Sequence, residues 1–393
     1  MTVIELIFWL ALFIVFYAYV GYGIFLYIII RLRRLFGKNP ALPAMPEDPH
    51  LPEVTLMVAA YNEEDFIDEK IRNSLNLDYP SNKLKFIFVT DGSTDSTTER
   101  IRAYNEITLL HEDSRRGKIA AVERAMAYVE TPLVIYTDAN TMLNPQAAKN
   151  IVRHYENPKV GAVAGEKRVT SGNSDSASGA GEGFYWKYES ALKRWDSELY
   201  SVVGAAGELF SIRTELYEEV PKDTVIEDFF MTLRIAKKGY KVVYEPEAYA
   251  VEGPSANVKE ELKRKVRIAA GGIQAIVRLA PLLNLFKYGT LSWQYVSHRV
   301  LRWTIAPLCL AILMAANIVL AVSPGGIYKI LLVLQFGFYI AALIGYLLEQ
   351  RQLKFKAFFI PYYFFIMNYA VYAGFWRYMK GSQSVVWERA KRK

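Results

Sequence analysis

Long apolar segments lie at both ends of the chain, and a polar region with short apolar runs lies between them. Val3 to Ile30 contains a single charged residue, Glu5. Three further apolar segments come late in the chain, at Trp303 to Val322, Ile327 to Leu348 and about Ala357 to Phe375. A helix of roughly 20 apolar residues crosses a bilayer. We therefore expect a transmembrane anchor at residues 1–30 and transmembrane or re-entrant helices at residues 303–379.

The charges beside these segments predict their orientation. The first segment has no basic residues before it and no small-residue cleavage site, so a retained anchor is favoured over a signal peptide. Four basic residues follow it at once: Arg31, Arg33, Arg34 and Lys38. By the positive-inside rule this side faces the cytoplasm, and we expect a cell membrane protein with several spans.

The last apolar segment brings this rule into conflict with the number of crossings. Four crossings would leave the basic tail at residues 380–393 outside the cell. Three basic residues before the last segment nevertheless mark that flank as inside: Arg351, Lys354 and Lys356. Either the last segment is re-entrant or interfacial, or the charge rule fails here.

The polar middle predicts an α/β domain at residues 53–255. A proline-rich linker at residues 31–52 leads to it from the anchor. Short buried runs at residues 54–60, 84–90, 107–110 and 133–136 alternate with helical segments, which is typical of a parallel sheet. Residues 170–183 form a Ser/Gly-rich loop, and a helix is expected over Phe184 to Leu199. Residues 256–302 are expected to form amphipathic interfacial helices, because Lys259 to Arg278 carries an apolar stripe with basic residues beside it.

Candidate ligand residues follow the predicted strands, where open α/β sheets bind ligands. Asp138 and Asn140 offer two oxygens to a hard cation such as Mg²⁺, although a D-x-N sequence also caps turns. Ala60 and Tyr61 can contact a nucleotide base by backbone and by ring stacking, or Tyr61 can simply pack. Asp91 can accept a hydrogen bond from a ribose hydroxyl or a base N–H.

Later motifs supply candidates for phosphate and proton chemistry. The basic stretch Arg115 to Lys118 precedes a predicted helix at Ile119 to Val129, and a diphosphate would offset its positive charge, although it can also be a solvated basic turn. Asp228 can act as a general base, although a carboxylate at a helix start is also stabilised by the helix dipole. Arg264 and Arg267 share a helix face, where lipid headgroups or a leaving nucleoside diphosphate are the candidate partners. Gly207 and Glu208 follow a small-residue loop that indicates close approach to a sugar.

Composition excludes several other classes of protein. Cys309 is the sole cysteine and lies in an apolar segment, so an internal disulfide is excluded. The net charge of +7 is concentrated near the apolar segments, which favours an anionic membrane surface over nucleic acid. The sequence contains no internal repeat and no zinc-type spacing of cysteine and histidine.

Seven motifs in order resemble those of the membrane-embedded family 2 glycosyltransferases, which include synthases of poly-N-acetylglucosamine, cellulose, chitin and hyaluronan. The motifs are AAYNEE at Ala59 to Glu64, TDGSTD at Thr90 to Asp95, RGK at Arg116 to Lys118, TDAN at Thr137 to Asn140, GAAGELFSIR at Gly204 to Arg213, IED at Ile226 to Asp228 and RKVR at Arg264 to Arg267. The resemblance covers nearly the whole chain. It implies a GT-A (Rossmann-like) fold, a nucleotide-sugar donor and inverting transfer.

The resemblance also implies a role for each matching residue. Tyr61, Glu63 and Asp91 would lie along the nucleoside, and Lys118 near it or the phosphates. Asp138 and Asn140 would hold Mg²⁺ or Mn²⁺ on the diphosphate. Asp228 matches the catalytic base, with Glu227 beside it in the same motif, and Arg267 matches the arginine of the family's Q-x-x-R-W motif.

That last motif departs from the family pattern. Arg264 stands where glutamine is usual, and Ile268 stands where tryptophan is usual. The tryptophan is associated with holding the acceptor in processive synthases, and the R-x-x-R form is nearer to lipid glycosyltransferases of the ceramide-glucosyltransferase type.

Three hypotheses follow for function. The chain transfers sugars to a growing polysaccharide, or it adds one sugar to a membrane lipid or polyprenyl carrier, or it is an inactive nucleotide-binding scaffold. A uridine diphosphate sugar (N-acetylglucosamine or a hexose) is the expected donor, with guanosine diphosphate mannose as the alternative.

Overall fold

The computed structural model describes residues 2–37, 43–169, 177–253, 258–322, 326–351, 353 and 355–381. Lys38, Lys354, the first half of the expected Ser/Gly-rich loop (residues 170–176), residues 323–325 and the basic tail from residue 382 lie outside these residues.

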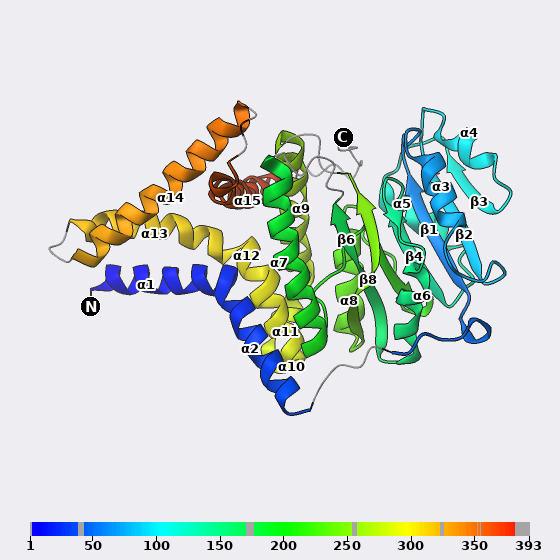
Figure 1. Ribbon diagram of the computed structural model, residues 1–393, viewed down its shortest axis with the longest axis horizontal. Helices are drawn as coiled ribbons and strands as arrows, with labels where there is room; N and C mark the ends of the chain where they lie inside the picture. Colours follow the sequence, from blue (N-terminus) through cyan, green and yellow to red (C-terminus); the bar gives the residue numbers. More distant parts are fainter. Residues whose placement is uncertain are drawn as a thin grey trace.

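A single mixed sheet forms the centre of the polar region, as Figure 1 shows. Its order is β3-β2-β1-β4-β7-β6-β8-β5. The strands are β1 (Val54–Ala60), β2 (Leu84–Asp91), β3 (Ile107–Glu112), β4 (Leu133–Asp138), β5 (Met142–Leu143), β6 (Val160–Val169), β7 (Leu209–Arg213) and β8 (Lys241–Glu252). The first four strands in this order are parallel, so their carboxyl ends share one edge. β7 runs antiparallel to both β4 and β6, so the start of β7 meets the end of β4.

Helices between the strands bury apolar side chains on both sides of the sheet. They are α3 (Ile67–Leu75), α4 (Thr97–Arg102), α5 (Lys118–Met126), α6 (Ala147–Val152) and α8 (Glu227–Lys237). β1 is buried at every position, which explains its continuous apolar sequence. The predicted α/β fold is confirmed, although the sheet is mixed and not wholly parallel, because β7 runs antiparallel to its neighbours.

Some element boundaries differ from the sequence predictions. α7 (Ala177–Leu199) begins seven residues before the expected Phe184, so residues 177–183 are helical and the loop prediction was wrong there. The composition favoured a loop because glycine and serine have low helix propensity, which is only a weak guide to structure.

The apolar segments form helices that lie across α7 and α9 (Val258–Arg278) from the sheet. These helices are α1 (Val3–Phe16), α2 (Tyr22–Leu35), α11 (Thr290–Tyr295), α12 (Leu301–Trp303), α13 (Ile305–Ala321), α14 (Gly326–Gln350) and α15 (Lys356–Met379). Within the described residues, three segments are long and apolar enough to cross a membrane: Val3–Leu35, Gly326–Gln350 and Ala357–Met379. The bent pair Thr290–Trp303 and Ile305–Ala321 makes a fourth if it counts as one span.

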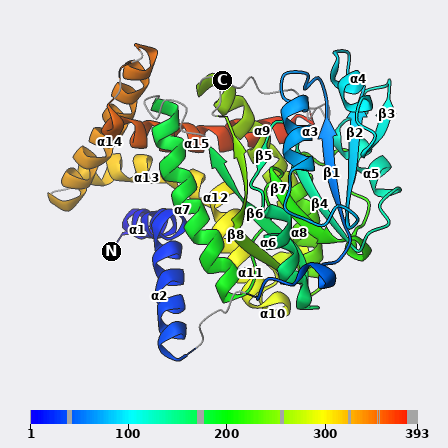
Figure 2. The same ribbon diagram turned by 45° about the vertical axis from the view of Figure 1, so that its right-hand side comes forward.

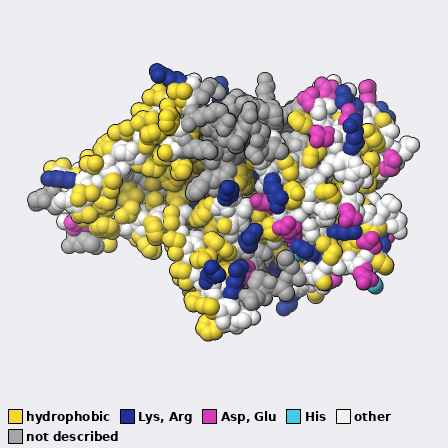
Figure 3. Space-filling model, in the orientation of Figure 1, with side chains coloured by type: hydrophobic (Ala, Val, Ile, Leu, Met, Phe, Trp, Pro, Cys, Tyr) yellow, Lys and Arg dark blue, Asp and Glu magenta, His cyan; other side chains and the backbone are white. Residues whose placement is uncertain are grey.

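The surface divides in the same way as the fold. Figure 3 shows hydrophobic side chains over the region of α1, α13 and α14, whereas charged side chains gather over the sheet. α7 and α9 lie between these two regions (Figures 1 and 2). In Figure 1, α15 is seen almost end-on while α1, α13 and α14 are seen from the side, so α15 runs crosswise to those three helices.

Candidate active site

The end of β4 supplies the first carboxylate of the site. Asp138 is the last residue of β4, between β1 and the start of β7. Thr137 donates a hydrogen bond from Oγ1 to the backbone oxygen of Glu208 (3.0 Å), which joins this strand end to the loop before β7. Lys70 lies fully buried beneath, and its Nζ donates to Thr137 Oγ1 (2.9 Å) and to the Thr141 carbonyl (2.7 Å). Burial lowers the pKa of Lys70 to about 7, and the charge of Asp138 acts in the opposite direction.

Lys118 reaches this carboxylate from the start of α5. Its Nζ lies 2.8 Å from Asp138 Oδ1 and 2.8 Å from Glu227 Oε1. Burial lowers the pKa of the Lys118 ammonium, but the carboxylates of Asp138 and Glu227 outweigh this, so its pKa lies above its ordinary value. Lys118 therefore remains charged and neutralises part of the negative charge of the site.

Asp91 fixes the loop that carries Lys118. Its Oδ1 accepts from the Arg116 amide (3.0 Å) and its Oδ2 from the Gly117 amide (2.7 Å). Gly117 has φ of +94°, which a side chain would strain, so the glycine lets the chain turn directly into α5. Asp91 thus holds the R-G-K loop in this structure, and its predicted contact with a nucleoside remains a prediction.

Glu227 and Asp228 begin α8 and have opposite pKa shifts. Burial raises the pKa of Glu227, but the Lys118 ammonium outweighs this and holds the pKa below its ordinary value. Burial, followed by repulsion from the Glu227 carboxylate, raises the pKa of Asp228 to about 7. Asp228 is therefore the carboxyl group here that exchanges a proton near neutral pH.

The candidate residues converge on Gly207. A side-chain carbon placed on Gly207 would lie 3.4 Å from Asp228 Oδ2, 3.5 Å from Lys118 Nζ and 3.8 Å from Asp138 Oδ2. A narrow pocket beside it is lined by Lys118, Asp138, Gly207 and Glu227 together with apolar side chains of β1, β4 and α5. The absence of a side chain at Gly207 keeps the space between the acidic groups open.

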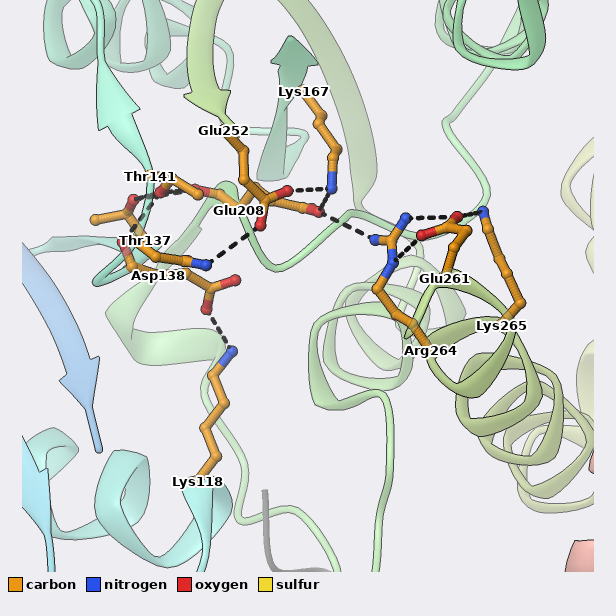
Figure 4. A network of polar contacts seen from close by, with 11 residues as sticks. Lys118, Thr137, Asp138, Thr141, Lys167, Glu208, Glu252, Glu261, Arg264 and Lys265 are labelled. Atoms are coloured by element: carbon orange, nitrogen blue, oxygen red, sulfur yellow. Dashed lines mark hydrogen bonds and ion pairs between the residues drawn. The ribbon is translucent and has the colours of Figure 1, made fainter. Parts of the chain in front are cut away.

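Glu208 turns away from this space into a network of charges, which Figure 4 shows. Its carboxylate pairs with Lys167, whose Nζ also lies 2.5 Å from Glu252 Oε2. Burial raises the pKa of Glu208, but the Lys167 ammonium outweighs this and holds the pKa well below its ordinary value. Glu208 therefore connects β6, β7 and β8, and its predicted contact with the sugar remains a prediction.

The two arginines of α9 differ in their surroundings. Arg264 binds Glu261 through Nε (3.0 Å) and Nη2 (3.1 Å), and its Nη1 lies 4.0 Å from Glu208 Oε1. In contrast, no described residue forms a hydrogen bond or ion pair with Arg267. Burial lowers the pKa of Arg267, and the carboxylates of Glu227, Asp138 and Asp228 partly offset this. Arg267 is thus half-buried beside the acidic residues, and its charge is available to a ligand.

The predicted nucleoside residues lie at the end of β1. Ala60 is buried, and Tyr61 is half-buried with the guanidinium carbon of Arg115 3.7 Å from its ring centroid. A base that stacks on Tyr61 would share or replace this contact. Glu63 is buried, and its amide donates to Thr97 Oγ1 (2.8 Å). Its role toward a nucleoside remains a prediction.

The donor set suits a divalent cation that also binds a phosphate ligand. Within the described residues no three His, Cys, Asp or Glu side chains group as a metal site. Asp138 offers one carboxylate, and Asn140, whose Nδ2 lies 3.4 Å from Glu252 Oε1, follows two residues later. Mg²⁺ commonly takes one or two protein carboxylates, with phosphates and water filling its shell. Asp138 and Asn140 fit that pattern.

Sequence reasoning missed the second layer of this site. Lys70 and Lys167 read as ordinary charged positions on a helix and a strand, yet both are buried. Their partners lie 67 and 41 residues away in the sequence, respectively. Nothing local in the sequence signals such pairs, because strand register and helix packing bring them together.

Comparison with known proteins agrees with the fold described above. Residues 55–220 match the model of "Glycosyl transferase family 2". The chain is 26% identical over 264 residues to poly-beta-1,6-N-acetyl-D-glucosamine synthase of Staphylococcus aureus (strain MSSA476), covering 65% of this chain and 62% of that protein. It is 23% identical over 280 residues to the synthase of the same name from Staphylococcus epidermidis, covering 69% and 67%. The chain thus matches about three fifths of the length of the first of these relatives.

A solved structure shares the fold over almost the whole length. It is the mannosyltransferase PcManGT from Pyrobaculum calidifontis in complex with GDP-Man and Mn²⁺, with a TM-score of 0.71. The match covers 96% of this chain and 99% of that one at 22% identity. At this identity the likeness establishes the fold.

Proposed function

Because this chain carries a family 2 glycosyltransferase domain, we propose that it is a membrane-bound inverting glycosyltransferase that moves a sugar from a nucleoside diphosphate to a growing polysaccharide. The observation that carries the proposal is the convergence of Asp138, Lys118 and Asp228 within 4 Å of one position at Gly207. A carboxylate for a metal, a fixed cation and a carboxyl group with a pKa of about 7 are the groups that such a transfer needs.

The residues divide the chemistry among them. An acceptor hydroxyl gives its proton to Asp228 while its oxygen bonds to the anomeric carbon of the donor sugar. The bond from that carbon to the diphosphate breaks on the opposite face, so the configuration inverts. Arg267 and Lys118 offset the charge of the departing diphosphate. A divalent cation held by Asp138 and Asn140 would supply further charge neutralisation at the diphosphate.

The donor is expected to be a uridine diphosphate sugar. The likeness to poly-beta-1,6-N-acetyl-D-glucosamine synthases favours N-acetylglucosamine. Guanosine diphosphate mannose is the alternative, because the structural neighbour was solved with that donor and Mn²⁺. Mg²⁺ or Mn²⁺ is the expected cofactor.

A second candidate is a single transfer to a membrane lipid or polyprenyl carrier. Two observations favour it: Ile268 occupies the place of the family's tryptophan, and Arg264 occupies the place of its glutamine. In either case the catalytic domain is expected to face the cytoplasm, next to the candidate membrane spans.

The test uses the purified full chain in detergent with labelled nucleotide sugars. We expect metal-dependent release of nucleoside diphosphate from one donor, and Asp228→Asn is expected to lower transfer by a factor of about 10² to 10⁴. Long products would support the polysaccharide synthase, and single additions would support the lipid transferase. If no donor reacts, or if Asp228→Asn retains full transfer, the enzyme proposal is wrong and the scaffold hypothesis gains support.

A further inference from the structure

Three ammonium groups surround one indole on the outer side of the Glu208 network. Trp186 lies on α7 and is half-buried. The Nζ atoms of Lys167, Lys193 and Lys265 lie 5.3, 5.7 and 5.5 Å from its ring centroid. These lysines come from β6, α7 and α9, so three separate elements bring positive charge to the same place.

The three lysines differ in their anionic partners. Lys167 pairs with Glu208 and Glu252, and the Nζ of Lys265 lies 3.5 Å from Glu261 Oε1. Lys193 is only 3% exposed, yet among the described residues none forms a hydrogen bond or ion pair with it. Its near neighbours are the rings of Trp186 and Tyr244, the latter centred 5.8 Å from Nζ.

The Lys193 side chain is almost completely buried, and aromatic contacts give its ammonium only weak stabilisation. A cation–π contact contributes about 0.5–2 kcal/mol. Burying an ammonium costs several kcal/mol, roughly, even after relaxation of the protein. The difference favours an anion beside Lys193, and the half-buried Trp186 gives the place contact with the outside.

The position of this cluster points to the acceptor side of the site. The donor residues Lys118 and Asp138 lie near Gly207, and the next residue, Glu208, binds Lys167 of the cluster. Two residues after Trp186 on α7, Tyr188 donates a hydrogen bond to the Tyr19 carbonyl (2.9 Å). Tyr19 lies in the first candidate membrane span. The cluster therefore lies between the catalytic loop and the membrane helices.

We propose that Trp186, Lys193 and Lys265 form a subsite for the phosphate group of a membrane-anchored acceptor. This inference rests on the proposed glycosyltransferase function, and it favours the second candidate acceptor, a membrane lipid or polyprenyl carrier, over a growing polysaccharide. The phosphate would pair with the Lys193 ammonium, while the acceptor's hydrocarbon chain would extend along α7 toward the candidate span. A neutral glycan would supply no charge for Lys193.

A binding experiment tests this subsite without requiring turnover. The full chain carrying Asp228→Asn, in neutral detergent, is titrated with farnesyl phosphate, farnesol and inorganic phosphate, and binding is followed by calorimetry. We expect farnesyl phosphate to bind at least tenfold more tightly than the other two probes. Lys193→Met is expected to weaken farnesyl phosphate binding by at least tenfold and to leave farnesol binding unchanged. Lys193→Arg is expected to keep most of the affinity.

Lys187→Met is the matched control, because Lys187 is exposed on the same helix. Unchanged binding by Lys193→Met, or equal weakening for farnesyl phosphate and farnesol, would overturn the subsite. Equal affinity for inorganic and farnesyl phosphate would overturn the membrane-anchored acceptor. If Lys193→Met does not fold, Lys265→Met replaces it in the test. Lys265→Met is expected to weaken farnesyl phosphate binding and to leave farnesol binding unchanged, and unchanged binding of farnesyl phosphate would contradict the subsite. Donor cleavage by the wild-type chain is measured separately, so a failure of the enzyme proposal is distinguishable.

Discussion

The surroundings of the neighbouring residues Glu227 and Asp228 shift the pKa values of their carboxyl groups in opposite directions. Glu227 pairs with Lys118, which keeps its pKa low. Burial and the charge of Glu227 raise the pKa of Asp228 to about 7. The low-pKa group can stabilise positive charge near the diphosphate, while the high-pKa group can accept a proton.

This difference predicts the pH dependence of transfer. Below its pKa Asp228 is protonated and has no capacity to accept the acceptor's proton. We therefore expect kcat/KM to rise about tenfold per pH unit up to pH of about 7 and then to level off. Initial rates from pH 5 to 9 with saturating metal measure this. A flat profile across that range would exclude Asp228 as the base.

The raised pKa of Asp228 also makes the free energy of unfolding depend on pH, which provides a second test of the shift. Between the ordinary pKa of 3.8 and about 7, the folded chain retains a proton that the unfolded chain releases. The free energy of unfolding therefore falls as pH rises through this window, and the full cost is present above pH 7. Asp228→Asn removes the cost, so its Tm should exceed that of the wild type at pH 8 and approach it at pH 4.

Lys118→Met tests the charge balance between Asp138 and Glu227. The substitution leaves two partly buried carboxylates without their ammonium, which should lower the free energy of unfolding by about 3–5 kcal/mol. A divalent cation can then bind Asp138 without competition from Lys118. We expect Mn²⁺ to raise the Tm of Lys118→Met by more than it raises that of the wild type or of Lys187→Met. An equal metal shift in all three proteins would argue against a cation at Asp138.

At the scale of elements, α9 connects the site to the apolar helices. Gly374 of α15 packs directly on α9: a side-chain carbon there would lie 2.7 Å from Ala269 Cβ, 2.8 Å from the Ala270 nitrogen and 3.0 Å from the Val266 oxygen. These contacts flank Arg267 in the sequence, so a shift of α15 would displace the part of α9 that carries Arg267.

Gly374→Val should therefore reduce transfer although Gly374 is not one of the site residues. The added side chain forces α15 and α9 apart at a cost of about 1–3 kcal/mol and shifts Arg267. We expect at least a tenfold loss of kcat, measured on detergent-purified protein that remains folded by circular dichroism. Gly337→Val on α14 is the control, because a side chain there meets no atom within 4 Å. Equal activity of the two variants would contradict the coupling.

The elements also show what the sequence could predict. Buried runs such as Val54 to Ala60 identified the central strands, and the polar residues after them identified the sheet edge, because both signals are local. The pairings of Lys167 with Glu208 and of Arg264 with Glu261 differ in this respect. The second lies within one helical turn and was within reach of sequence reasoning, whereas the first depends on β6 and β7 meeting in the sheet. The composition of α15 likewise does not predict that this helix runs crosswise to the other apolar helices.

At the scale of the whole molecule, that direction suggests how the conflict between charge and crossing number can be resolved, and we propose that α15 lies along the membrane surface. α1, α13 and α14 lie roughly side by side, whereas α15 runs across them and packs on α9 beside the catalytic domain (Figure 1). If α15 lies along the membrane surface, three crossings remain. The N-terminus is then outside, the catalytic domain inside, and the basic tail after Lys380 also inside, in agreement with the positive-inside rule.

Cysteine labelling in intact cells measures this topology. In a Cys309→Ser background, Thr2→Cys should react with a membrane-impermeant maleimide, while Gly381→Cys at the end of α15 should react only after the cells are permeabilised. Arg351→Cys, between α14 and α15, should behave like Gly381→Cys, because a helix along the surface keeps both of its ends on one side. Labelling of Gly381→Cys in intact cells would mean that α15 crosses the bilayer, and the basic tail would then violate the charge rule that the other segments obey.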